Sequence, residues 1–249
     1  MKRKFKAIIK AIFLLNIISG PHNVYGQETN DFYSESSEDI SSSFEMIESN
    51  VSENVFEETS NLDETNLRMD FKDYMPFAKF VNYQYQGDGS LFETQDIIME
   101  YMPDSQGIFQ VAAFTGNSAT AFVYQIRETG LFELAVFENY NIVEDLRYSD
   151  SAMDGVESLL LPNNVSEGQS FQSGYNKENR RTITEVIDNF SFGGYTFQNV
   201  IKIHEVQQNN QFYYYLAPEY GLILMERLDE HNNPQRIIQL LSTQGNVIE

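Results

Sequence analysis

The sequence predicts a mainly β protein with an antiparallel sheet and few, short helices. After residue 66, apolar and polar residues alternate with a period of two in short runs, and Gly, Asn and Pro separate these runs. The same region has no long apolar stripe of period 3.6 with helix caps. The chain has no Cys and no Trp, but it has 15 Tyr and 19 Phe, which are favoured in strands and can fill a core.

The first 26 residues have the pattern of a secretory signal peptide. Four of the first six residues are basic, and residues 7–19 are apolar except for Lys10 and Asn16. This apolar segment is shorter than the ~20 residues that a transmembrane helix needs. We place cleavage after Gly26, with Val24 and Gly26 in the two positions that require small side chains. An uncleaved membrane anchor is the alternative.

The charge of the chain limits its partners. Residues 1–26 contain five basic and no acidic residues, so their removal lowers the formal net charge from −21 to −26. Such a protein repels nucleic acids and anionic membrane surfaces. Without Cys it forms no disulfide and has no lipid-attachment residue after the signal. We therefore expect a secreted, extracellular protein, free or held non-covalently at the cell envelope.

Residues 27–66 are predicted to be a disordered acidic linker. They contain 12 acidic residues, no basic residue and two Ser clusters, with only scattered apolar residues. High net charge with little apolar surface to bury favours disorder. A short helix within residues 44–56 that forms on contact with a partner is the alternative.

Residues 67–249 are predicted to be one all-β domain, large enough to bury a core without disulfides. The best candidate for a short helix is 66–74, before Pro76. The regular spacing of strands and turns favours an antiparallel meander. The expected strands are 81–85, 108–114, 119–126, 131–137, 181–187, 195–206, 211–216, 222–228 and 236–241.

The motifs that resemble metal sites are incomplete. The segment that begins with His204 starts like a helical zinc-protease motif, but Gln208 stands where the second His belongs. Residues 150–161 resemble a calcium loop in part, but Ala152 and Leu161 stand where oxygen ligands belong. We therefore predict no catalytic residue, no cofactor and no metal ligand. Loose calcium binding by the acidic surface is the alternative.

One strand places apolar residues on a face that could line a ligand. In residues 195–206, Phe197, Ile201 and Ile203 are expected on one face, with Lys202 and His204 on the other. The aromatic run 212–215 could form a ligand platform, although core packing explains it as well. The candidate ligand-lining residues are Phe197, Ile201, Ile203, Phe212 and Tyr214.

Five segments carry a resemblance to a group of exported proteins and lipoproteins of Gram-positive bacteria. They are 159–162 (LLLP), 168–171 (GQSF), 181–184 (RTIT), 194–200 (GYTFQNV) and 213–223 (YYYLAPEYGLI). The group is distantly similar to lipoprotein-carrier folds, which implies a strongly curved sheet, or open half-barrel, around an apolar cavity. The chain departs from the group in three ways. Phe171 replaces Trp, Glu219 replaces a turn Gly, and the lipid-bearing Cys is absent.

These observations lead to one functional hypothesis and two alternatives. The hypothesis is a secreted, non-enzymatic binding protein of the Gram-positive cell envelope that holds an apolar or amphiphilic ligand, or a protein partner. The first alternative is an extracellular hydrolase that uses two carboxylates on cell-wall or polysaccharide substrates. The second is a purely structural surface protein.

Overall fold

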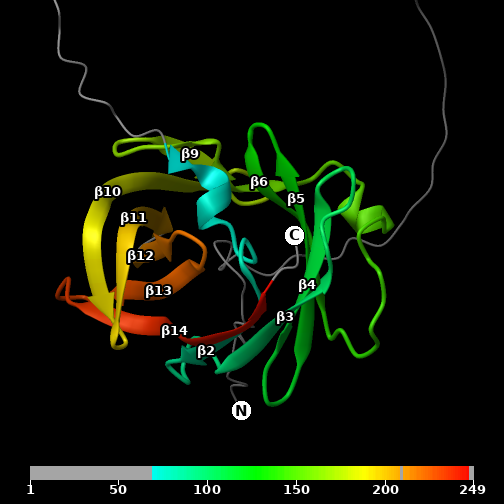
Figure 1. Cartoon of the computed structure of the whole chain (residues 1–249), viewed down its shortest axis with the longest axis horizontal. Helices are drawn as coiled ribbons and strands as arrows, with labels where there is room; N and C mark the ends of the chain where they lie inside the picture. The colour runs from blue at the N-terminus through cyan, green and yellow to red at the C-terminus, as the bar shows by residue number, and fades with distance from the viewer. Residues whose placement is uncertain (1–68, 208–209, 247–249) are drawn as a thin grey trace, which may run out of the picture. The chain divides into compact units, whose positions relative to one another are not determined.

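The computed structural model describes residues 69–207 and 210–246 (Figure 1). The predicted signal peptide, the acidic linker and the partner-induced helix therefore lie outside the described residues. Where the chain is described, no helix is both long and apolar enough to cross a membrane.

The described residues form one twelve-stranded antiparallel sheet and one two-stranded pair. The order in the large sheet is β7-β6-β5-β4-β3-β2-β14-β13-β12-β11-β10-β9, and β1 pairs with β8. The strands are β1 (Met69–Asp70), β2 (Phe80–Gly87), β3 (Gln95–Tyr101), β4 (Ile108–Phe114), β5 (Ala119–Arg127), β6 (Gly130–Glu138), β7 (Ser158–Pro162), β8 (Asn164–Val165), β9 (Ser170–Ser173), β10 (Asn179–Phe192), β11 (Tyr195–Gln207), β12 (Asn210–Ala217), β13 (Gly221–Leu228) and β14 (Pro234–Asn246).

Two meanders make up the large sheet. Strands β2–β7 follow one another in the sheet, as do β9–β14, and the pairing of β2 with β14 joins the two meanders at the centre. The sheet curves until its edge strands approach each other (Figure 1). The Ser158 hydroxyl of β7 lies 3.3 Å from the Ser173 hydroxyl of β9 and accepts a hydrogen bond of 2.8 Å from the Gly174 amide. The predicted mainly β fold with one strongly curved antiparallel sheet is confirmed.

Helical structure in the described residues is limited to two single turns. The turn η1 (Phe71–Tyr74) begins after Asp70, whose side chain accepts a hydrogen bond of 3.0 Å from the Lys72 amide. This turn lies within the helix expected at 66–74. The turn η2 (Asp150–Ala152) begins after Ser149. It occupies the segment that resembles a calcium loop.

The concave face of the sheet surrounds the main hydrophobic core. Residues of period two on both meanders point inward, and the segment that contains η1 adds Phe71, Tyr74, Met75 and Phe77. Tyr83 and Tyr85 of β2 stack at 6.2 Å between ring centroids. The inward side chains include Tyr83, Tyr85, Ile97, Phe109, Val111, Tyr124, Leu131, Ile183, Ile201, Ile203, Phe212, Tyr214, Leu216 and Met225.

Smaller clusters bury parts of the convex face. Phe190, Phe192 and Phe197, near the β10–β11 turn, pack with Tyr215 and Leu224 of β12 and β13. On the other meander, the β6–β7 connection covers the outer side of β4–β6 through Tyr140 and Ala152, which belong to two further clusters. Figure 1 shows this connection and η2 along the outer side of those strands.

The β12–β13 turn forms although Glu219 stands where the group of exported proteins and lipoproteins usually has Gly. Glu219, in the β12–β13 turn, has a φ of 68°, a region in which residues other than Gly are uncommon. Its carboxylate pairs with Lys79, and its amide donates a hydrogen bond of 2.7 Å to the Asp73 carbonyl. The turn therefore forms with Glu219 in place of Gly.

Candidate functional site

Four of the five predicted ligand-lining residues belong to the packed core. Ile201, Ile203, Phe212 and Tyr214 are 0–1% exposed. The register places Ile203 opposite Tyr214 on adjacent strands, and η1 packs against β12 and β13. These side chains contact one another and other apolar side chains of the chain, so a ligand here would have to displace core residues.

Phe197 does not share their face, which corrects the sequence-based expectation. Phe197 packs with Val200 in the outer cluster, whereas Ile201 and Ile203 belong to the inner core. Asn199 lies between them with a φ of 52°, which interrupts the alternation of extended backbone. The Asn199 carbonyl accepts a hydrogen bond of 2.7 Å from the Tyr74 hydroxyl. The irregular residue is therefore tied to the η1 segment.

The inner face also contains an ion pair that the sequence analysis missed. Arg181 of β10 and Glu205 of β11 lie opposite each other in the register, and the Arg181 Nε donates to Glu205 Oε2. Both side chains are fully buried, and the Arg181 guanidinium carbon lies 5.3 Å from the Tyr214 ring centroid. Within the described part of the chain, both Arg181 Nη atoms and Glu205 Oε1 lack a well-formed hydrogen bond.

Burial affects the protonation of Tyr214, the aromatic neighbour of this ion pair. Burial raises the pKa of Tyr214 well above its ordinary value, and the negative charge of Glu205 raises it further. Tyr214 therefore stays neutral beside the ion pair at physiological pH. Arg181, Glu205 and Tyr214 are buried close together on the inner face of the sheet, away from solvent.

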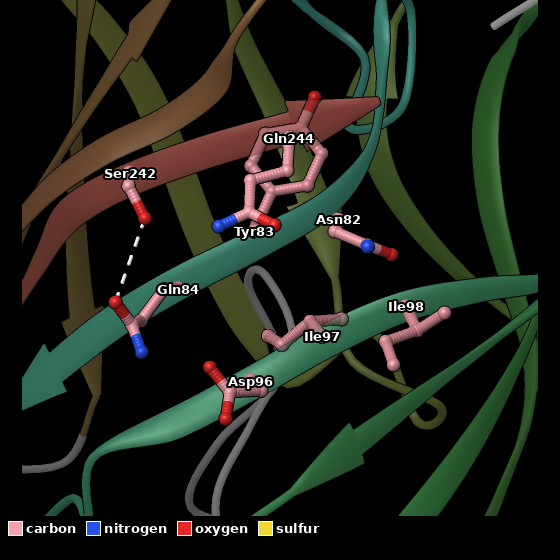
Figure 2. Close-up of a pocket in the computed structure, with 8 residues that line it drawn as sticks. All are labelled: Asn82, Tyr83, Gln84, Asp96, Ile97, Ile98, Ser242 and Gln244. Atoms are coloured by element: carbon pink, nitrogen blue, oxygen red, sulfur yellow. Dashed lines mark hydrogen bonds between the residues drawn. The ribbon is translucent and has the colours of Figure 1, made fainter. Parts of the chain in front are cut away.

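A polar hollow of about 220 Å³ lies on the outer side of the sheet, where β3, β2 and β14 run side by side. Figure 2 shows Asn82 and Gln84 on β2, and Ser242 and Gln244 on β14. The Ser242 hydroxyl donates to Gln84 Oε1 at 3.5 Å. The complete lining consists of Asn82, Tyr83, Gln84, Asp96, Ile97, Ile98, Ser242 and Gln244.

The alternation of β2 explains why this surface is polar. Tyr83 and Tyr85 are buried on the inner face, so Asn82, Gln84 and Gln86 stand on the outer one. On β14 the register shifts between Leu240 and Ser242, which brings polar residues next to those of β2. The sequence shows the alternation of β2, but it does not show that β14 is its neighbour.

A second hollow, of about 200 Å³, continues along the same two strands. It is lined by residues of the β2 end and of the β14 start, including Gln86, Arg236 and Gln239. The Gln239 side-chain amide donates to Gln86 Oε1. We call the outward Asn82, Gln84, Gln86, Gln239 and Gln244 the amide row.

The first hollow presents side chains suited to hydrogen bonding. Amide side chains both donate and accept, so they match hydroxyl and amide groups of a neutral ligand. Asp96 is the one carboxylate in the lining, whereas glycoside hydrolysis needs two carboxyl groups across a cleft. The described residues also include no group of three or more His, Asp or Glu that could hold a metal ion.

Comparison with known proteins gives two distant structural neighbours. No protein-family model matches the chain, and no curated protein matches it. One neighbour is a proposed exported protein with a YmcC-like fold from Bacteroides fragilis, with 10% identity, 67% of this chain and 95% of that chain covered, and a TM-score of 0.36. The other is a proposed lipoprotein from Parabacteroides distasonis, with 14% identity, 69% and 98% covered, and a TM-score of 0.35.

One neighbour is described as an exported protein and the other as a lipoprotein, and these words apply to those proteins alone. At these TM-scores the likeness transfers no residue role and no function. The neighbours also give no support to the Gram-positive origin that the resemblance implies.

Proposed function

We propose that this chain is an exported, non-enzymatic binding protein that holds a neutral, hydroxyl-rich chain, such as a cell-envelope glycan. The ligand would lie on the outer side of β3, β2 and β14. The observation that supports this proposal is the amide row beside the 220 Å³ hollow at the centre of the sheet.

The composition of the hollow favours a neutral ligand. Its lining contains Asp96 and no basic residue, so an anionic group would meet repulsion and no compensating ion pair. The strongly acidic chain adds long-range repulsion of polyanions. The hollow is smaller than the ~300–1,000 Å³ of pockets that enclose whole small molecules, so it fits one segment of a longer chain.

The competing proposal is that the protein binds an apolar or amphiphilic ligand inside the curved sheet. Its candidate lining, which includes Ile201, Ile203 and Phe212, is closed by core packing in this structure. Opening it would expose large apolar side chains at a cost of about 1.5–3 kcal/mol for each. The outer surface needs no such rearrangement, and we therefore favour it.

Calorimetric titration with neutral oligosaccharides tests the proposal. Two forms of the protein, both comprising residues 27–249, are compared: the wild type and the Gln84→Ala/Gln244→Ala variant. Each is titrated with chitotetraose and with cellotetraose. Loss of two hydrogen-bonding side chains is expected to weaken binding by about tenfold or more.

The control is Gln198→Ala, which removes an exposed amide of β11 outside the hollow. Binding by the wild type and the control, with loss in the double variant, supports the outer site. Equal binding by all three proteins, or no binding of either sugar by the wild type, contradicts it. Lipid that stays bound to the purified protein in native mass spectrometry would instead favour a ligand site inside the curved sheet.

A further inference from the structure

The β6–β7 connection, residues 139–157, presents large apolar side chains to solvent. Ile142 and Val143 are 78% and 69% exposed, and Tyr148, Met153 and Val156 are each about half exposed. Single exposed apolar residues are common on protein surfaces, but this one connection carries five, and Ile142 and Val143 are adjacent in the chain. We call these five residues the apolar patch. It shares no residue with the hollow.

The backbone beneath the patch is held in place by buried groups. The fully buried Gln110 of β4 accepts a hydrogen bond of 2.7 Å from the Leu146 amide and donates one of 2.8 Å to the Glu144 carbonyl. The Tyr140 hydroxyl donates to Glu100 at 2.8 Å and accepts from the Glu144 amide at 2.8 Å. The connection is therefore fixed on the sheet.

Ion pairs and hydrogen bonds hold the middle of the same connection. Arg147 pairs with Asp145 at 2.8 Å and with Asp104 at 3.7 Å, and its Nη1 donates to the Met102 carbonyl at 3.1 Å. The Tyr148 hydroxyl donates to Asp104 at 2.5 Å. These contacts hold residues 140–148 in place in the free protein, so docking there costs less conformational entropy.

The charges around the patch select the chemistry of its partner. Residues 138–157 contain six acidic residues and one basic residue, Arg147. Two of the acidic residues are already paired within this protein, Asp145 with Arg147 and Glu157 with Arg127. A second copy of this chain would bring two such acidic surfaces together, and an anionic bilayer would be repelled. A partner with apolar side chains among Lys or Arg would complement both the apolar residues and their surroundings. The acidic residues are Glu138, Glu144, Asp145, Asp150, Asp154 and Glu157.

We infer that the apolar patch is a docking surface for a basic, apolar segment of a partner protein. Docking would bury Ile142 and Val143, and the partner's cations would meet the acidic residues of the connection that are not already paired. The inference is independent of the proposed glycan site, because its residues and its ligand chemistry are different.

Fluorescence anisotropy with two labelled peptides tests this inference. One peptide alternates Lys and Leu, and the other alternates Glu and Leu. Each peptide is added to three forms of the protein, all comprising residues 27–249. They are the wild type, the patch variant Ile142→Ser/Val143→Ser, and the variant Val206→Ser/Leu241→Ser. The second double variant is the matched control, since Val206 and Leu241 are exposed apolar residues outside the patch.

We expect the Lys/Leu peptide to bind the wild type and the control, and to bind the patch variant at least about tenfold more weakly. The Glu/Leu peptide is expected to bind none of them. No binding of the Lys/Leu peptide to the wild type, or equal loss in both variants, would overturn the inference. Wild-type dimers that the patch variant loses in sedimentation would overturn it too, in favour of a second copy. Binding to phosphatidylglycerol vesicles that the patch variant loses would also overturn the inference, in favour of a membrane surface as the partner.

Discussion

At the scale of single residues, the ion pair between Arg181 and Glu205 is the most demanding feature of the core. Two fully buried charges must offset their desolvation through each other, and Arg181 uses one of its five N–H donors in this pair. Neither residue stands out in the sequence, because Arg and Glu occur on exposed faces of many strands. Only the pairing of β10 with β11 brings them together on the inner face.

Removing one partner of this pair should be more damaging than removing both. Glu205→Ala leaves a buried cation without its partner, so we expect the free energy of unfolding to fall by about 3–5 kcal/mol. Arg181→Met/Glu205→Leu replaces the pair with apolar side chains and should cost much less. Urea unfolding of both variants measures the difference. A double variant less stable than Glu205→Ala would show that the pair contributes net stability.

The tyrosines that face the core give the protein a sensitivity to alkaline pH. Burial, with a smaller contribution from the charge of Asp73, raises the pKa of Tyr74 to about 12. In the unfolded chain a Tyr loses its proton near pH 10. Stability from Tyr74 is therefore complete below about pH 10 and is lost as the pH rises towards 12.

Tyr74→Phe should make this loss shallower, because Phe has no proton to release. The variant also loses the hydrogen bond to the Asn199 carbonyl, which should cost about 1 kcal/mol at neutral pH. Chemical unfolding at pH 8 and pH 11 tests both effects. The exposed Tyr195→Phe serves as the control. A pH dependence unchanged in Tyr74→Phe would contradict the role given to Tyr74.

At the scale of elements, strand positions were more predictable than strand partners. Alternation correctly indicates β2, because its inner face is buried and its outer face is polar. Strands β4 and β5 were also placed correctly, although both of their faces are largely buried. Strand β3 was not predicted, since its apolar residues Ile97, Ile98 and Met99 are consecutive and give no clear period. The pairing of β2 with β14, which creates the hollow, joins segments at opposite ends of the domain.

The β12–β13 turn depends on the glycine that ends it. Gly221 has a φ of 67°, and a Cβ at this position would lie 3.1 Å from the Cα of Pro76. Gly221→Ala should therefore lower the free energy of unfolding by about 2 kcal/mol or more. Gly89→Ala is the matched control, since Gly89 has a φ of 72° but open space around its Cα.

Thermal unfolding compares the two glycine variants. The difference between them isolates the contact between the β12–β13 turn and the segment that follows η1. Equal losses of stability in both variants would contradict this account. They would mean that the backbone near Pro76 shifts to accommodate the methyl group added by Gly221→Ala with no loss of stability, and that the positive φ alone causes the effect.

At the scale of the whole domain, the sequence established the mainly β class but could not place a site. The resemblance to curved-sheet folds implied an apolar cavity as the ligand site, and the candidate lining was Phe197, Ile201, Ile203, Phe212 and Tyr214. In the structure the chain fills that interior with side chains from both meanders and from the η1 segment. Which polar rows meet on the outer face depends on long-range register, which alternation does not determine.

The outer amide row and the inner apolar residues therefore offer two different places for a ligand. The amide row, with Gln84 and Gln244 beside the hollow, is already open to solvent. The inner residues are closed by core packing, to which the η1 segment contributes against β12 and β13.

Nuclear magnetic resonance titration of the ¹⁵N-labelled chain with chitotetraose distinguishes these two places directly. We expect saturable shifts at the side-chain amides of Asn82, Gln84 and Gln244, with the backbone amides of Ile201 and Phe212 unchanged. Shifts centred on Ile201 and Phe212, or no saturable shift in the amide row, would contradict a ligand site on the outer face of the sheet.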